Sequence, residues 1–310
     1  MAKSRLKSAQ ISTVITDLDN TLFDWFDFWY HAFEAMLDAL VRSSGVPRET
    51  LVREIRQIHR RYGTPEYAFL IQELPSLRRL HPGGDLAEIY DEAIHAYRRV
   101  RKDHLKLYPG VLPTLDSLKE QGCLMVGYTD SLRFYSAERV RKLGLDGVLD
   151  FLYSPLDHEL PASFLLSGPQ RLAESGRLEK TVHRLLPRKE RKPNPRVLLD
   201  IIRQVRADKA STIYVGNSLM HDIAMANEAH VKNVYAAYGN AVDPQEYLLL
   251  QQVSHWNDDD IEREEALRRE HVRPTFTLHQ TFSELLSLFE FTRFTPQRRV
   301  PSSKAVSMPA

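Results

Sequence analysis

The stretch Thr13-Val-Ile-Thr-Asp17-Leu-Asp19-Asn-Thr21-Leu-Phe23 decides the fold class of this 310-residue chain. A short apolar run ends abruptly in two carboxylates, and a hydroxyl follows them. Two carboxylates crowded at the end of a buried strand are costly unless a cation lies nearby. Aspartate also suits covalent phosphoryl transfer and the binding of hard metal ions. Asp and Asn after a strand serve as helix N-caps and turn residues too, so other segments must decide between these interpretations.

The composition excludes several classes of partner. The chain has 42 basic and 41 acidic residues, and its net charge of +1 favours neither nucleic acid nor an anionic membrane as a partner. Cys123 is the only cysteine, so no internal disulfide can form and a reducing compartment fits. The basic N-terminus lacks an apolar signal-peptide core, and no apolar run approaches the roughly 20 residues of a membrane span. We therefore expect a cytoplasmic protein; its oligomeric state is not readable from the sequence.

Five apolar runs rich in β-branched residues alternate with helical stretches. Their continuous apolar character is typical of parallel strands covered on both faces, and the alternation predicts a doubly wound α/β sheet. Residues 154–191 are predicted to be a long connection with one or two short helices at most. The predicted strands are Ile11–Thr16, Leu124–Thr129, Val148–Tyr153, Thr212–Val215 and Asn233–Ala237.

One long segment interrupts the alternation directly after the first strand. Residues 25–106 contain no convincing strand, and their aromatic and aliphatic residues recur at helical spacing. This pattern predicts an all-helical insert in a core made of residues 1–24 and 107–290. The tail, residues 291–310, has Pro, Ser and Arg but no apolar period, so we expect it to be disordered.

Three later segments also place polar side chains at strand ends or helix starts. A hydroxyl after a strand can hold a phosphate oxygen, a lysine before a helix can project a cation, and a glycine permits close approach of a ligand. Each segment alone is a weak signal, because such residues are also ordinary caps and solvated side chains. The segments are Thr129-Asp130-Ser131, Arg191-Lys192-Pro193-Asn194-Pro195, and Gly216-Asn217-Ser218 with Asp222 beyond it.

Taken in order, these motifs resemble the haloacid dehalogenase (HAD) superfamily, and its phosphatases in particular. The resemblance runs from Asp17-x-Asp19-x-Thr21 through Thr129 and Lys192-Pro-x-Pro to Gly216-Asn217-Ser218-x-x-x-Asp222. It implies a Rossmann-like core with strand order five-four-one-two-three. The helical insert corresponds to a C1-type cap by position and helical type only. Strands one, two and four would be neighbours, so their polar ends would converge.

The resemblance implies a role for each residue of the first three motifs. Asp17 would attack phosphorus and form an aspartyl-phosphate, and Asp19 would act as general acid and then general base. Thr129, the adjacent Asp130 segment and Lys192 would bind the transferring phosphoryl group. The acid at Asp19 disfavours carbon–halogen hydrolysis, because family members with that activity lack it.

The resemblance also implies Mg²⁺ as cofactor. Asp17 and the backbone carbonyl of Asp19 would bind it. The fourth motif departs from the family pattern, because Asn217 stands where an Asp is usual. An amide oxygen can bind Mg²⁺ but adds no charge, so weaker metal affinity is expected. Asp222 is a further candidate ligand, or a residue that orients waters or Lys192.

The cap implies a small phosphorylated metabolite as substrate, because such caps close over the site and exclude large ligands. Mg²⁺-dependent phosphomonoester hydrolysis is therefore the expected activity. Two alternatives stay open. One is phosphomutase-type transfer to a sugar, and the other is a catalytically impaired relative with a binding or regulatory role, which Asn217 would explain.

Overall fold

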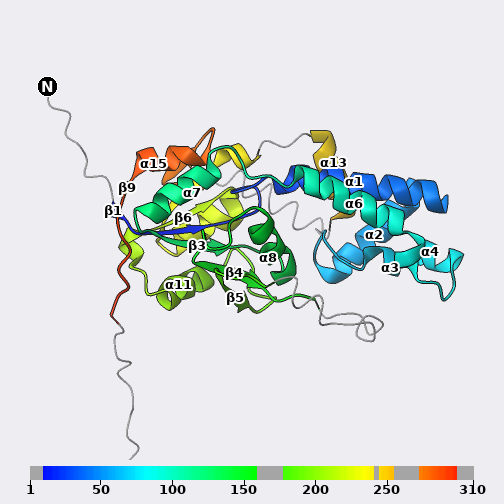
Figure 1. Cartoon of the computed structure of the whole chain (residues 1–310), viewed down its shortest axis with the longest axis horizontal. Coiled ribbons are helices and arrows are strands. Elements are labelled where there is room, and N and C mark those ends of the chain that lie inside the picture. Colours follow the sequence, from blue (N-terminus) through cyan, green and yellow to red (C-terminus); the bar gives the residue numbers. More distant parts are fainter. Residues whose placement is uncertain (1–9, 159–176, 241–243, 255–271, 299–310) are drawn as a thin grey trace, which may run out of the picture.

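A computed structural model of the protein describes residues 10–158, 177–240, 244–254 and 272–298. An α/β core lies beside a group of helices in Figure 1. The core is built on a parallel sheet of seven strands. In sheet order these are β5 (Val182–Leu186), β4 (Phe151–Pro155), β3 (Leu124–Tyr128), β2 (Thr13–Thr16), β6 (Thr212–Gly216), β7 (Lys232–Ala236) and β8 (Phe276–Leu278).

Strand β2 lies at the centre of the sheet and is buried on both faces. Successive residues face opposite sides, so Val14 packs in one hydrophobic cluster and Ile15 in the other. The order β7-β6-β2-β3-β4 is the expected five-four-one-two-three, which confirms the doubly wound, Rossmann-like sheet. One face is covered by α7 (Val111–Glu120), η4 (Phe282–Glu284) and α15 (Leu285–Leu288), and the other by α11 (Pro195–Gln204) and α12 (Ala224–Glu228).

The insert after β2 is helical, as predicted. Its first helix begins at the N-cap Asp24, whose side chain accepts the backbone N–H of Asp27, and ends at Gly45, which has a left-handed φ of 68°. The helices are α1 (Trp25–Ser44), α2 (Arg48–Tyr62), α3 (Leu70–Glu73), α4 (Pro75–Leu80), α5 (Leu86–Ile89) and α6 (Asp91–His104). Residues 25–106 are the proposed cap.

Two neighbouring chain segments connect the proposed cap to the core. Phe23, before α1, forms an antiparallel bridge with Leu107, after α6. The backbone N–H of Tyr108 also donates to the carbonyl of Leu22 at 3.0 Å. The chain therefore leaves and re-enters the core at one place, which is the geometry of a hinge.

The connection after β4 differs from the prediction. It contains β5, which pairs with β4 and extends the sheet at its edge. Its sequence Val-His-Arg-Leu-Leu carries little apolar period, because an edge strand is only half buried, and only Leu186 is buried. The helices expected in this connection would have to lie in residues 159–176, which are outside the described residues. The short strand β8 was not predicted either.

The expectation of a disordered tail is wrong for residues 291–298. Strand β9 (Glu290–Phe291) pairs with β1 (Gln10–Ile11), and the backbone N–H of Thr292 donates to Ile11 at 2.8 Å. Phe294 packs against the hydrophobic cluster that contains Ile15, and its backbone N–H donates to the carbonyl of Gly122. Backbone pairing of this kind leaves no apolar period in the sequence. Residues 299–310 lie outside the described part of the chain.

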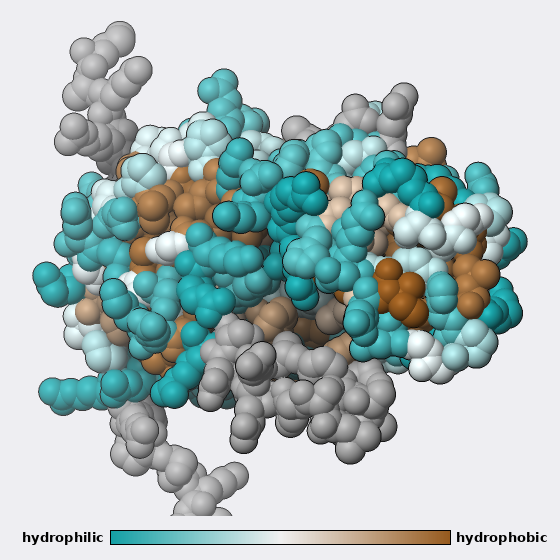
Figure 2. All heavy atoms as spheres, turned by 45° about the vertical axis from the view of Figure 1, so that its right-hand side comes forward, coloured by the Kyte–Doolittle hydropathy of each residue, from teal (hydrophilic) through white to brown (hydrophobic). Residues whose placement is uncertain are grey.

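Further short elements of the core are α8 (Arg133–Lys142), η1 (Lys209–Ser211), η2 (Leu219–Ile223) and η3 (Ala237–Asn240). Helix α13 (Pro244–Val253) packs against α1 and α2 of the insert. Hydrophilic side chains predominate on the face in Figure 2, with hydrophobic patches between them. Within the part of the chain that the structure describes, none of the helices combines the length and apolar character that crossing a bilayer requires.

Candidate active site

The predicted site residues meet at the carboxyl edge of the central strands. Asp17 directly follows β2, Thr129 follows β3 and Asn217 follows β6. Because β3, β2 and β6 are parallel neighbours, these three ends lie side by side. The backbone N–H of Asp17 donates to the carbonyl of Val215 at 2.8 Å and continues the pairing into the loop.

The ammonium of Lys192 lies at the centre of this edge. It donates to Asp17 Oδ1 at 2.5 Å, to Asp222 Oδ1 at 2.8 Å and to the Tyr214 hydroxyl at 3.2 Å. Burial by itself would lower the pKa of Lys192, but the carboxylates of Asp17 and Asp222 raise it well above its usual value. Lys192 is therefore a permanent cation between two buried acids.

Burial also shifts the pKa of Asp17. Desolvation is the main reason why the pKa of its carboxyl rises from 3.8 to about 8. Lys192 opposes this rise, while the charges of Asp222 and Asp19 add to it. Lys192 and Arg139 supply two positive charges against the carboxyl groups of Asp17, Asp19, Asp222 and Glu66, so the site favours the arrival of a further cation.

Asp222 holds Lys192 in place, because both of its carboxylate oxygens are occupied by protein donors. Oδ1 accepts from Lys192 and from the Tyr214 hydroxyl at 2.8 Å, and Oδ2 accepts the backbone N–H of Ser218 at 2.9 Å. Gly216 permits this approach, since a Cβ there would lie 2.4 Å from the Asp222 carboxyl carbon. Of the two roles expected for Asp222, the arrangement supports orientation of Lys192 rather than direct metal binding.

The oxygen atoms around Asp17 fit a hard divalent cation. The Thr21 hydroxyl lies 3.3 Å from Asp17 Oδ2 and 3.4 Å from Asn217 Oδ1, so both oxygens border the same space. The Asn217 amide nitrogen is turned away and donates to Asn240 at 3.0 Å. This leaves the amide oxygen facing Asp17. Carboxylate, amide and carbonyl oxygens are the donor set that Mg²⁺ prefers.

Asp19 points to a different group of partners. Its Oδ2 accepts from the hydroxyls of Thr129 at 3.0 Å and Ser131 at 2.7 Å. Its Oδ1 accepts from Arg139 at 2.9 Å. Asp19 therefore lies beside the site as the acceptor of three hydrogen bonds, one of which comes from the Thr129 hydroxyl.

Arg139 joins the core to the proposed cap. It comes from α8 and is buried, with 3% of its surface exposed, and it forms ion pairs with Asp19 and with Glu66 of the helical insert. Its guanidinium lies 5.0 Å from the ring centre of Phe28 in α1. Burial by itself would lower the pKa of Arg139, but Glu66 and Asp19 raise it above its usual value. A buried, permanent cation therefore connects the predicted acid/base to the insert.

The sequence of this chain matches a known family over the residues that build the site. A model of haloacid dehalogenase-like hydrolases matches residues 11–230. The chain belongs to this family. A glyceraldehyde 3-phosphate phosphatase from Methanopyrus kandleri is 26% identical over 258 residues, which cover 81% of this chain and 91% of that protein.

Solved structures of HAD proteins also resemble the chain along most of its length. A 2-haloacid dehalogenase from Pseudomonas syringae pv. Tomato is 19% identical, with 90% of this chain and 97% of that chain covered and a TM-score of 0.49. A HAD phosphatase from Thermococcus onnurineus is 16% identical, with 92% and 100% covered and a TM-score of 0.48.

In this HAD site, Asp130 lies against the backbone of Lys192. Its carboxylate accepts the backbone N–H of Lys192 at 3.1 and 3.3 Å, and burial raises the pKa of the carboxyl. The side chain therefore supports the lysine loop. What remains proposed for phosphate binding at this position is the backbone N–H.

Sequence reasoning missed three residues of the site and gave no role to a fourth, Ser131. Tyr214 lies inside a strand and reads as a core aromatic, and Ser131 reads as a cap. Arg139 is one of several basic residues in α8, and Glu66 lies in a polar turn of the insert. Apart from Ser131, which lies two residues after Thr129, each contacts the HAD motifs only through the tertiary fold. The spacing of these residues in the sequence therefore carried no signal for them.

Proposed function

We propose that this protein is a Mg²⁺-dependent HAD phosphatase that hydrolyses a small phosphomonoester through an aspartyl-phosphate on Asp17. The main support is the contact of the Lys192 ammonium with Asp17 and Asp222, beside the oxygen atoms of Asn217 and Thr21. A fixed cation next to a carboxylate at a strand end suits a dianionic phosphoryl group. The relative from Methanopyrus kandleri is a phosphatase, which favours the same reaction class.

The proposed chemistry proceeds in two displacements. A carboxylate oxygen of Asp17 attacks phosphorus, and the bond from phosphorus to the leaving oxygen breaks as Asp19 gives that oxygen a proton. In the second step Asp19 takes a proton from a water molecule, whose oxygen attacks the phosphorus of the aspartyl-phosphate. This releases inorganic phosphate and restores Asp17. Thr129 and Lys192 bind phosphoryl oxygens in both steps.

The cation would be held by Asp17, the backbone carbonyl of Asp19 and Asn217. Mg²⁺ in this position supplies positive charge to the phosphoryl oxygens and to the crowded carboxylates. Asp222 is proposed to act through Lys192. The amide of Asn217 gives the site one negative charge fewer than a carboxylate would, so a comparatively weak metal site is expected.

The substrate is proposed to be a small phosphorylated metabolite. The helical insert lies beside the carboxyl edge of the sheet, and Glu66 reaches Arg139 within a few ångströms of Asp19. We expect a cap in this position to close over the site and to favour a compact leaving group. The three-carbon sugar phosphate named for the Methanopyrus relative is of that class.

The test is hydrolysis of p-nitrophenyl phosphate by the full chain, with and without Mg²⁺. Metal-dependent release of p-nitrophenolate by the parent and its loss in Asp17→Asn are expected. In Asn217→Asp the added carboxylate should lower the Mg²⁺ concentration for half-maximal rate roughly tenfold, because ligand charge tunes affinity.

The same measurements separate the alternatives. An inactive parent that gains activity in Asn217→Asp would favour the impaired, regulatory alternative. Release of phosphate only when a sugar acceptor is omitted, with transfer to the sugar when it is present, would favour a mutase. Undiminished hydrolysis by Asp17→Asn would disprove the assignment of the nucleophile.

A further inference from the structure

We propose that Asp27, His31 and His104, with Glu246, form a binding site for a transition metal ion of the Zn²⁺ class at the hinge of the proposed cap. The site shares no residue with the candidate active site at the carboxyl edge of the sheet. It uses imidazole nitrogens, whereas the candidate Mg²⁺ site uses oxygens only. The inference is independent of the proposed phosphatase activity.

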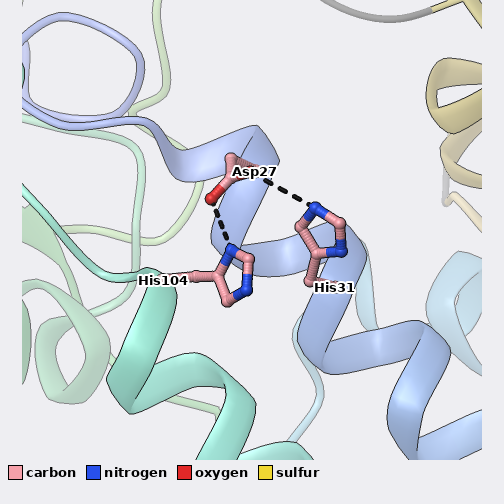
Figure 3. A group of neighbouring side chains, drawn as sticks. All are labelled: Asp27, His31 and His104. Carbon is pink, nitrogen blue, oxygen red and sulfur yellow. Dashed lines mark hydrogen bonds and ion pairs between the residues drawn. The ribbon is translucent and has the colours of Figure 1, made fainter.

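Three helices bring the four side chains together. Asp27 and His31 lie one helical turn apart on α1, so they share a face, and His104 is the last residue of α6, which packs along α1. His104 Nδ1 lies 2.8 Å from Asp27 Oδ2, and His31 Nε2 lies 3.4 Å from Asp27 Oδ1. Figure 3 shows both rings turned toward the carboxylate. From α13, Glu246 Oε1 lies 3.9 Å from His31 Nε2.

The donor set and its spacing suit a tetrahedral ion. One ligand atom from each of Asp27, His31 and His104 can be chosen so that all lie within 4.8 Å of one another. Two imidazoles with one or two carboxylates are a frequent Zn²⁺ set, whose ligand atoms lie about 3.4 Å apart when each is about 2.1 Å from the metal. The side chains of His104, His31 and Asp27 are 34%, 37% and 41% exposed. They can therefore rotate with little resistance to bring their ligand atoms to the spacing that the ion requires.

An ordinary pair on the same cap provides the contrast. Asp91 and His95 also lie one turn apart, with His95 Nε2 3.2 Å from Asp91 Oδ2. Among the residues that the structure describes, however, only the group around Asp27 brings three such ligands together. The pair Asp91–His95 is therefore a matched control: the same two residue types at the same spacing, without a third ligand.

The position of the group suggests what the metal would do. Asp27 is in the first turn of α1, just after Phe23, and His104 ends α6, just before Leu107. Phe23 and Leu107 are the bridged residues at which the chain passes between core and cap. Glu246 lies on α13, which packs against α1 and α2 of the insert, so a bound ion would connect both hinge segments to α13. Occupancy should therefore fix the two hinge segments relative to each other.

The test is the visible absorption of Co²⁺ bound to the full chain in the presence of excess Mg²⁺, which occupies oxygen sites. Tetrahedral Co²⁺ with nitrogen ligands absorbs strongly, and octahedral Co²⁺ with oxygen ligands absorbs weakly. The parent should show intense bands that saturate at one Co²⁺ per chain and disappear when Zn²⁺ is added. His31→Ala and His104→Ala should bind Co²⁺ at least about tenfold more weakly, and His95→Ala should bind it like the parent.

A second measurement keeps the test independent of misfolding in the variants. Zn²⁺ should raise the Tm of the parent and of His95→Ala, and it should leave the Tm of the conservative variants His31→Gln and His104→Gln unchanged. The absence of strong Co²⁺ bands in the parent would overturn the proposal. Equal bands in the parent and in a folded His31→Gln or His104→Gln would overturn it as well. Neither result depends on hydrolysis, so failure here is distinct from failure of the proposed function.

Discussion

At the scale of single residues, the site is defined by crowded, buried carboxyl groups. Asp17 and Asp222 both contact Lys192, and Asp19 lies close enough to raise the pKa of Asp17 further. The arrangement is costly in the metal-free protein, because buried charges lose hydration. A divalent cation would relieve that cost, which connects the candidate Mg²⁺ site to the protonation of Asp17.

We expect binding of Mg²⁺ to release a proton. At pH 7 the solution lies below the pKa of about 8 for Asp17, so the metal-free protein holds a proton that the cation expels. The release should approach about one proton per Mg²⁺ at pH 7 and fall to nearly none by about pH 9.5. Calorimetric titration in buffers of different ionisation enthalpy measures it. Asp17→Asn should release none at either pH, and equal release by this variant would assign the proton elsewhere.

At the scale of elements, α8 supplies what the strand-end motifs lack. It carries Arg139, which holds Asp19 on the core side and Glu66 on the cap side. The side chain of Glu66 is 7% exposed and also accepts the indole N–H of Trp25 at 3.1 Å. This chain of contacts makes the orientation of Asp19 depend on the position of the helical insert.

Replacing Arg139 with Met should impair the general acid selectively. An alkyl leaving group needs a proton, whereas p-nitrophenolate leaves without one, so a misoriented Asp19 matters mainly for alkyl phosphates. We expect kcat to fall on the order of 100-fold for an alkyl phosphomonoester and only a few-fold for p-nitrophenyl phosphate. Equal losses on both substrates would indicate a merely structural role. Arg141→Met, on the same helix, is the control.

The ion pair between Arg139 and Glu66 should also be visible in stability. Arg139→Met leaves the buried carboxylate of Glu66 without its cation, which should cost about 3–5 kcal/mol of the free energy of unfolding. Adding Glu66→Gln removes that charge and should restore part of the loss. Urea denaturation of the two single variants and the double variant measures the coupling. Additive losses would show that the two side chains do not interact energetically.

At the scale of the whole molecule, the two ends of the described chain pair with each other, and the C-terminal end also bonds to the core. β1 pairs with β9, Phe294 donates to Gly122, and the N–H of Gln297 donates to Arg206 at 2.8 Å. Contacts between residues so far apart in sequence add stability only when the whole core is formed. The segment 291–298 therefore acts as a strap across the core, although its sequence predicts disorder.

Truncation distinguishes this strap from the residues beyond it. Deleting 292–310 removes several backbone hydrogen bonds and the packing of Phe294, and should lower the free energy of unfolding by about 2–4 kcal/mol. Deleting 299–310 alone should leave it unchanged, because the sequence there predicts disorder. Thermal and urea denaturation of the two proteins provide the comparison. Equal stability would show that the strap contributes nothing.

The sequence by itself determined the sheet, the helical insert and the order of the HAD motifs. These follow from local chemistry: runs of β-branched residues, helical spacing, and polar groups next to strand ends such as Asp17 and Asn217. Only the tertiary structure decided that Asp222 holds Lys192 and that Arg139 connects Asp19 to Glu66. It likewise decided which half-buried strands border the sheet and which histidines meet at the hinge. Such contacts join residues from distant segments. Their energies depend on how deeply the side chains are buried and how closely they approach one another, which no local sequence pattern specifies.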